Sequence, residues 1–308
     1  MARGYSIHIG LNEVDPEKYN GWKGELGGCE NDARAMLKLA MGADFLPLNL
    51  LLTAEATAGN VIKAIKRAAR LLREEDTLLL TYSGHGGQVP DLDEDEEDEL
   101  DETWVLYDRE VIDDELYALY GGFARGAHIV VLSDSCSSGT VISLGADGED
   151  TTGQRLVRAI PDDVQEAHLQ EYGDQYRRIV QGLRIREHDP IDASVLLLSG
   201  CQDYESSTEE NGHGLFTRAL IDVWDEGRFR GSYRKLHAAI LDALPEDADQ
   251  NPNLFQAGRP DVNFADRKAF SFGNRLRSSW FAPRQAGSEQ GDGAPAKRQE
   301  AKRITSRR

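Results

Sequence analysis

Two apolar runs, each leading into a glycine- or serine-rich segment, limit what this chain can fold into. The first run, TLLLTY at residues 77–82, leads into SGHGG, and the second, AHIVVL at residues 127–132, leads into SDSCSSG. Both runs have the length and bounded apolarity of buried strands. In an open parallel sheet, the loops that leave the carboxyl ends of neighbouring strands line one crevice. The pattern therefore predicts that His85 and Cys136 lie side by side at one edge of a sheet.

A histidine beside a cysteine in such a place suits nucleophilic catalysis. The thiolate is the reactive form, and because an unassisted thiol is mostly protonated at neutral pH, a neighbouring imidazole has to supply the base. Backbone N–H groups must also come within about 3 Å of a developing oxyanion, and those of Gly86 and Cys136 are our candidates. The alternative interpretation of Cys136 is a buried core cysteine. A turn rich in serine and glycine is a poor place for one, so we expect a catalytic pair of His85 and Cys136.

Strands and helices alternate along the chain, which predicts an α/β fold. We expect strands at residues 5–11, 48–52, 77–82, 127–132, 194–199 and 261–264, and a short hairpin arm at residues 103–107. We expect helices at residues 31–40, 57–73, 113–123, 215–224 and 233–244, the second of them capped by Thr57. The pattern fails over residues 144–192, which predicts a long irregular connection with a polar amphipathic stretch. We expect four parts: residues 1–144 as the half with the catalytic pair, 145–192 as an insertion, 193–283 as the second half of the same domain, and 284–308 as a disordered basic tail.

Composition narrows the class of protein. The formal net charge of −19 argues against nucleic-acid binding and favours cationic partners or metal ions. The three cysteines include no CxxC pair, which argues against a disulfide framework or a zinc site and favours a reducing compartment. No apolar run approaches the roughly 20 residues that span a bilayer. We expect a cytoplasmic protein without a membrane segment.

The chain resembles metacaspases, in the wider caspase and hemoglobinase clan of cysteine peptidases, and most of all the type I group. The matching segments, in family order, are CENDA at residues 29–33, the acidic stretch ending at Glu102, IDDE at 112–115, SGCQD at 199–203 and GLFT at 214–217. The resemblance runs from about residue 5 to about residue 264, and a histidine-to-cysteine gap of about 50 residues is also that of caspases. It implies a caspase–hemoglobinase fold, a three-layer α/β/α sandwich with a mostly parallel sheet of about six strands. It also implies a monomeric cysteine endopeptidase that works with a dyad.

Two alternatives stay open at this point. One is another member of the clan, of the clostripain, gingipain or CHAT type, although these share the dyad and not the segments at 29–33 and 112–115. The other is a noncatalytic scaffold or calcium-binding regulator with the same fold. An intact dyad argues against the second alternative.

Substrate specificity follows from charge. A pocket for aspartate needs arginines, whereas an acidic pocket selects Arg or Lys through paired, desolvated charges. Asp134 lies two residues before Cys136 and shares its face of an extended segment. The resemblance implies that Asp134 and Asp32 receive a basic P1 side chain, with Cys29 and Ser83 lining the same pocket. The plainer interpretation of Asp32 is a helix N-terminal charge favoured by the dipole. We expect protein substrates cut after Arg or Lys.

Calcium is the one cofactor that we expect, on two grounds. Residues 91–102 hold ten carboxylates in twelve residues, which is either a solvated charge run or a calcium-binding one. The resemblance implies a different site that combines Asp101 with Asp113 and Asp114. The chain departs from the family at Ser143, where a further aspartate is expected, and at Ser137, where the usual residue is histidine.

The insertion suggests regulation by cleavage. It carries Arg177, Arg178, Arg184 and Arg186, and an enzyme that cuts after arginine could process itself there or be activated by another protease. The alternative is an exposed helix with incidental arginines.

Overall fold

The computed structural model describes residues 1–90, 100–135, 156–185, 189–201, 208–210, 212–246, 248, 250–259, 261 and 263–273. Residues Met1–Asn274 form one compact unit. Several predictions lie outside the described residues: those for Cys136, Ser137, Ser143, Arg186, residues 91–99 and the tail at 284–308.

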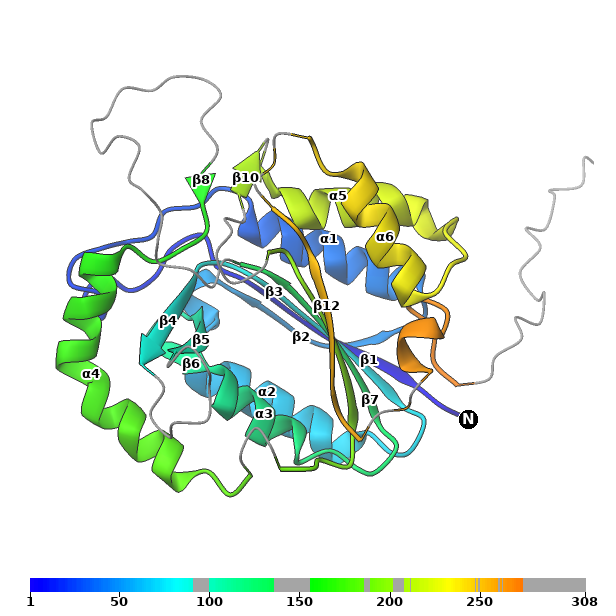
Figure 1. The fold of residues 1–308 in the computed structure, drawn as a ribbon, viewed down its shortest axis with the longest axis horizontal. Helices are drawn as coiled ribbons and strands as arrows, with labels where there is room; N and C mark the ends of the chain where they lie inside the picture. The colour runs from blue at the N-terminus through cyan, green and yellow to red at the C-terminus, as the bar shows by residue number, and fades with distance from the viewer. Residues whose placement is uncertain are drawn as a thin grey trace, which may run out of the picture. The chain divides into compact units, whose positions relative to one another are not determined.

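Six strands form the central sheet, in the order β12-β9-β7-β3-β1-β2 (Figure 1). Their bounds are β1 (Gly4–Gly10), β2 (Leu46–Leu52), β3 (Thr77–Ser83), β7 (His128–Asp134), β9 (Ser194–Ser199) and β12 (Asn253–Gly258). All neighbouring pairs are parallel except β12 and β9, which are antiparallel. The central strands β1, β3 and β7 are buried along their whole length, as expected for strands covered on both faces.

Helices cover both faces of this sheet. Figure 1 shows α2 (Ala58–Leu71) and α3 (Asp113–Tyr120) on one face, and α1 (Cys29–Gly42), α5 (Leu215–Trp224) and α6 (Tyr233–Ala243) on the other. Each face has its own apolar core. The predicted cap of α2 is present, since the Thr57 hydroxyl accepts a hydrogen bond from the Asn60 N–H at 3.2 Å. The expected three-layer α/β/α sandwich with a mostly parallel, six-stranded sheet is confirmed.

Two small antiparallel sheets stand at the carboxyl end of the central strands. One contains β4 (Gly86–Pro90), β5 (Leu100–Val105) and β6 (Glu110–Ile112), and so includes the predicted hairpin arm. The other contains β8 (Leu156–Val157), β10 (Thr208–Glu210) and β11 (His213–Gly214). Short 3-10 helices occur at η1 (Thr53–Glu55), η2 (Asp225–Gly227) and η3 (Phe264–Asp266). Among the described residues, no helix is long and apolar enough to cross a membrane.

The predicted last strand at residues 261–264 is wrong. The sheet ends instead with β12, which pairs with β9 from Asn253↔Ser199 to Gly258↔Ser194. As an edge strand, β12 is mostly half-buried or exposed, so it lacks the continuous apolar pattern that marked the other strands. Phe264 is buried in η3, where its ring packs against Tyr233 and His128.

The prediction of an irregular connection over residues 144–192 is wrong for its second half. Residues there form α4 (Asp162–Gly182), a helix of 21 residues. Its buried positions are Val164, His168, Tyr176 and Val180. They follow helical spacing, but two of the four are polar or amphipathic residues, which hid the stripe in the sequence.

Candidate active site

The sheet brings together the two chain segments that were expected to carry catalysis. Strands β3 and β7 are parallel neighbours, and their last residues, Ser83 and Asp134, are register partners. His85 follows β3 by two residues, and Cys136 follows β7 by two residues. The predicted adjacency of the two strands is confirmed. Cys136 itself lies outside the described residues, so its position beside His85 stays a prediction.

His85 is held in one orientation by the loop before α1. Its Nε2 lies 3.0 Å from the Gly24 carbonyl oxygen, and its ring centroid lies 4.7 Å from that of Trp22. A carbonyl only accepts hydrogen bonds, so Nε2 carries the proton and Nδ1 of the neutral ring holds a lone pair. Nδ1 is buried and has no hydrogen-bond partner among the described residues. The structure therefore presents Nδ1 as the basic atom.

Burial sets the protonation state of this imidazole. Desolvation lowers the pKa of His85 to about 4, although the hydrogen bond to Gly24 opposes the shift. The ring is neutral at pH 7 as a result. A neutral imidazole is ready to take a proton from a thiol, which is the role of a general base.

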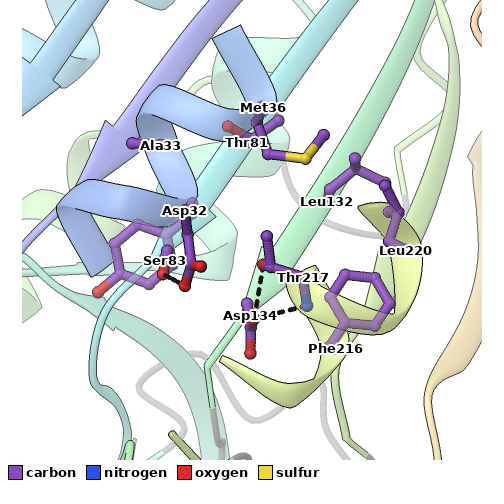
Figure 2. Close-up of a pocket in the computed structure, with 11 residues that line it drawn as sticks. Asp32, Ala33, Met36, Thr81, Ser83, Leu132, Asp134, Phe216, Thr217 and Leu220 are labelled. Carbon is purple, nitrogen blue, oxygen red and sulfur yellow. Dashed lines mark hydrogen bonds between the residues drawn. The ribbon is translucent and has the colours of Figure 1, made fainter. Parts of the chain in front are cut away.

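Two carboxylates meet beside the end of β3. Asp32 comes from the first turn of α1 and Asp134 from the end of β7, and Figure 2 shows them with Ser83 and Thr217 in one pocket. The Ser83 hydroxyl donates to Asp32 Oδ2 at 2.8 Å. The Thr217 N–H and hydroxyl donate to Asp134 Oδ2 at 2.9 and 2.6 Å. Asp32 thus lies at a helix N-terminus and in the pocket as well, so the two interpretations of it are compatible.

The fully buried guanidinium of Arg158 lies between these carboxylates. The His213 imidazole also faces Asp32, with Nδ1 at 2.7 Å from Oδ1, and this contact raises the pKa of His213. Arg158 Nη2 donates to Asp32 Oδ2 at 2.8 Å, and its Nη1 lies 3.2 Å from Asp134 Oδ2. Nη1 also donates to the Ser83 hydroxyl at 2.8 Å, and a third carboxylate, that of Glu209, lies 3.5 Å from Nη2. Because buried charges persist only when they are paired, the group of acidic side chains is shaped to hold a guanidinium.

The main chain at Arg158 meets the other predicted element of the site. The Gly86 N–H, our candidate oxyanion donor, donates to the Arg158 carbonyl oxygen at 3.0 Å. The Ile160 N–H in turn donates to the Gly86 carbonyl at 2.9 Å. When the arginine side chain lies in the acidic pocket, the carbonyl of the same residue therefore accepts a hydrogen bond from Gly86, the residue after His85.

Neither of the two described cysteines has the character of a nucleophile. Cys29 is fully buried beside Ser83, and burial raises the pKa of its thiol to about 12. The Cys201 thiol is also buried and donates to the Ser135 carbonyl at 3.1 Å. Cys29 contacts Ser83 but is not among the residues that line the pocket of Figure 2.

The expected calcium ligands gather at one end of the β5–β6 hairpin. Asp101 lies in β5, and Asp113 and Asp114 begin α3 directly after β6. Asp113 Oδ2 accepts a hydrogen bond from the Glu102 N–H at 3.3 Å. Within the described ranges, however, no three His, Cys, Asp or Glu side chains are arranged to hold a metal ion. The described residues do not form the expected site by themselves, and the calcium expectation stays a prediction.

The arginines proposed for processing do not share one loop. Arg177 and Arg178 are exposed residues inside α4, and Arg184 follows the end of that helix. Arg177 forms an ion pair with Asp174, one turn earlier in the helix. The prediction of an irregular connection is therefore wrong at Arg177 and Arg178, and the alternative of an exposed helix describes these two residues.

Sequence reasoning missed several contributors to this site. Gly24 orients His85, Thr217 holds Asp134, His213 contacts Asp32, Glu209 adds a third carboxylate, and Arg158 lies among them. Thr217 was within a segment that carried the family resemblance, but nothing in its type indicated this contact. Arg158 follows a long segment without periodicity, and the only signal was a basic residue after two apolar ones.

Known proteins resemble this chain over most of its length. The family model described as Caspase domain (Peptidase_C14) matches residues 14–263. Metacaspase-1 of Saccharomyces cerevisiae is 29% identical over 311 residues, which cover 85% of this chain and 68% of that protein. Metacaspase-1A of Aspergillus clavatus is 34% identical over 293 residues, with coverage of 84% and 67%. Among solved structures, the crystal structure of protein GSU0716 from Geobacter sulfurreducens matches with a TM-score of 0.77 and 43% identity, covering 87% of this chain and 98% of that one.

Proposed function

This chain belongs to the caspase-domain family of cysteine peptidases, and on that premise we propose that it is an endopeptidase that cleaves proteins after arginine or lysine. Cys136 is the nucleophile, His85 is the base, and Asp32 and Asp134 bind the basic P1 side chain. The substrates are protein segments that present an extended basic residue.

One observation carries the specificity: a guanidinium is bound by Asp32, Asp134 and Ser83, all of them buried. A charge-assisted hydrogen bond contributes about 1.5–3 kcal/mol, so two or more such bonds account for a large preference over neutral side chains. An aspartate at P1 would add a negative charge to a pocket that already holds three carboxylates. Cleavage after aspartate is therefore not expected.

The mechanism is acyl transfer through a thioester. His85 Nδ1 takes the thiol proton, and the sulfur of Cys136 attacks the P1 carbonyl carbon. The Gly86 N–H, together with the backbone N–H of Cys136, stabilises the oxyanion. His85 then protonates the leaving amine, and water, deprotonated by the same imidazole, hydrolyses the thioester. The Gly24 carbonyl keeps Nε2–H in place throughout.

Hydrolysis of fluorogenic peptides tests the proposal. Peptides that differ only at P1 (Arg, Lys or Asp) are offered to the wild type and to Cys136→Ala, each with and without added calcium. We expect cleavage after Arg and Lys by the wild type only. Faster cleavage after Asp than after Arg, or equal rates for Cys136→Ala and the wild type, would contradict the proposal. A requirement for calcium would support the predicted metal site.

A further inference from the structure

Trp104 is a buried residue that is linked by its contacts to the loops of both His85 and Cys136. It lies in β5, where it is the register partner of Gly86, the candidate oxyanion donor. Its indole ring packs in the apolar core on the α2 side of the sheet. The plain interpretation is a core side chain whose N–H has found an acceptor, as buried indoles usually do. Two of its neighbours, however, connect it to the proposed chemistry.

The first neighbour links the indole to the loop that carries His85. The Trp104 ring stacks on the ring of Tyr82, with centroids 4.5 Å apart and planes 10° from parallel. The Tyr82 hydroxyl donates to the His85 carbonyl at 2.6 Å, and the Val105 N–H donates to the same carbonyl at 3.0 Å. Trp104 therefore packs against the side chain that holds the main chain of His85.

The second neighbour links the indole to the loop that carries Cys136. Trp104 Nε1–H donates to the Ser133 hydroxyl at 3.1 Å, and the hydroxyl oxygens of Ser133 and Ser135 lie 3.0 Å apart. An indole N–H only donates, so it uses one lone pair of Ser133 and leaves the Ser133 proton free to bond Ser135. All three side chains are buried. A chain of hydrogen bonds thus runs from β5 to the residue just before Cys136.

Ser135 is held by its carbonyl as well as by its hydroxyl. The Cys201 thiol donates to the Ser135 carbonyl at 3.1 Å. That carbonyl and the Cys136 N–H belong to one peptide unit, which is planar, so a group that fixes the carbonyl also fixes the direction of the N–H. The Cys136 N–H is the other candidate oxyanion donor. The contacts of Ser135 therefore act on a group that the proposed reaction uses.

We propose that Trp104 is a positioning residue for the oxyanion hole: its N–H, acting through the two serines, orients the N–H of Cys136. The inference rests on the proposed function, in which that N–H stabilises the oxyanion. Loss of the indole N–H should slow attack on the substrate carbonyl, because the donor then no longer points at the developing charge. Binding of the P1 side chain and the basicity of His85 should not change.

Two pairs of substitutions test the chain of hydrogen bonds. Trp104→Phe keeps an aromatic ring for the stack and removes the N–H, and Trp224→Phe is its control, since it makes the same change in a buried tryptophan of the other apolar core. Ser133→Thr and Ser133→Val have nearly the same shape, and only threonine keeps the hydroxyl. Urea unfolding first establishes that each variant is folded at the assay temperature.

Two readouts separate positioning from a structural role. Hydrolysis of a P1-Arg peptide gives kcat and KM. Alkylation by iodoacetamide, followed by peptide mass, gives the reactivity of Cys136 across pH. Alkylation needs the thiolate but forms no oxyanion. A disturbance of the catalytic pair would therefore slow both reactions, whereas a misplaced oxyanion donor would slow hydrolysis alone.

We expect Trp104→Phe and Ser133→Val each to lower kcat by about 10- to 100-fold with little change in KM. The double variant should be no slower than the slower single variant, because either substitution breaks the same chain. Ser133→Thr and Trp224→Phe should keep nearly the wild-type kcat, and all variants should be alkylated at Cys136 as fast as the wild type.

Three results would overturn the inference and leave the proposed function standing. They are an unchanged kcat in folded Trp104→Phe, equal losses of kcat in Ser133→Thr and Ser133→Val, and alkylation that slows in parallel with hydrolysis. Absence of Cys136-dependent hydrolysis of any peptide by the wild type would instead refute the proposed function.

Discussion

Gly214 is the residue that leaves room for a guanidinium in the acidic pocket. A Cβ added there would overlap Asp134 Oδ2 and the Arg158 Nη1, although the backbone conformation itself suits any residue. Overpacking of a tight site costs about 1–3 kcal/mol, so we expect Gly214→Ala to lower kcat/KM for a P1-Arg peptide by roughly 5- to 150-fold.

The control for this substitution is Gly59→Ala in α2, where an added Cβ meets nothing within 4 Å. It should leave kcat/KM unchanged and raise stability by about 0.5–1 kcal/mol, because alanine favours helix. A folded Gly214→Ala protein with wild-type kcat/KM would show that the pocket does not bind the P1 side chain.

Trp22 shields His85, and this makes a prediction for the pH dependence of activity. Burial lowers the pKa of His85 to about 4, so the imidazole of the wild type is unprotonated and competent down to nearly that pH. Trp22→Ala admits water beside the ring and should raise the pKa toward its ordinary value of about 6.5. The acid limb of the kcat/KM profile then moves upward in pH. The exposed neighbour Lys23→Ala is the control, and an acid limb that stays in place in Trp22→Ala would contradict this view of the site.

At the scale of elements, a buried glutamate joins β6 to α4. Glu110 Oε2 accepts from the Thr103 hydroxyl at 2.5 Å, Oε1 accepts from Gln165 Nε2 at 2.7 Å, and the Tyr176 hydroxyl accepts from the Glu110 N–H at 3.0 Å. Desolvation raises the pKa of Glu110 to about 7, against the effect of the hydrogen bonds from Thr103 and Gln165. His168 Nε2 lies 3.7 Å from Oε1, and burial lowers the pKa of His168, so this imidazole places no positive charge beside the carboxylate near neutral pH.

The pKa of Glu110 in the folded protein, compared with its ordinary value, gives the direction in which stability changes with pH. The folded-state pKa of about 7 exceeds the ordinary 4.5, so the stability that protonated Glu110 contributes is complete below pH 4.5 and is lost as the pH rises through 7. Relative to Glu110→Gln, the wild type should lose about 3 kcal/mol of unfolding free energy between pH 4.5 and pH 8. Urea unfolding of both proteins across this range measures the difference, and a difference that does not change with pH would refute the assignment.

The elements also show where sequence reasoning succeeds and where it fails. Strands β3 and β7 were predictable because continuous apolar runs bounded by glycine and serine have few other uses, and Thr57 marked the start of α2 by its capping chemistry. The edge strand β12 and helix α4 were not, since both are largely exposed and carry little apolar signal. In the site, Asp32, Asp134 and Ser83 followed from a family resemblance. Arg158 did not, because its role depends on pairing with β10, about 50 residues later in the chain, and local sequence contains no such information.

At the scale of the whole molecule, the site is assembled from segments on both sides of residue 158. Strand β7 comes before it and β9 after it, and the two are parallel neighbours from His128↔Ser194 to Ser133↔Ser199. Helix α5, from the second part, shares an apolar core with α1, from the first. A chain that limited proteolysis cuts in the segment between β7 and β9 should therefore remain one folded body.

This makes a prediction for the cut protein. Under native conditions the two fragments should elute together from a gel-filtration column, and they should separate only in denaturant. The uncut Cys136→Ala protein provides the reference elution volume. Native separation of the fragments would contradict the idea that one sheet holds both parts.

The account depends most on recognition of a P1 positive charge by Asp32 and Asp134. Its most direct test compares two peptides that differ only at P1, one with arginine and one with citrulline, which has nearly the same shape and no charge. We predict that the wild type prefers arginine by at least about 100-fold in kcat/KM, equal to about 2.7 kcal/mol, and that Asp134→Asn loses most of this preference. Equal kcat/KM values for the two peptides would contradict the account, because they would mean that the carboxylates do not read the charge of the substrate.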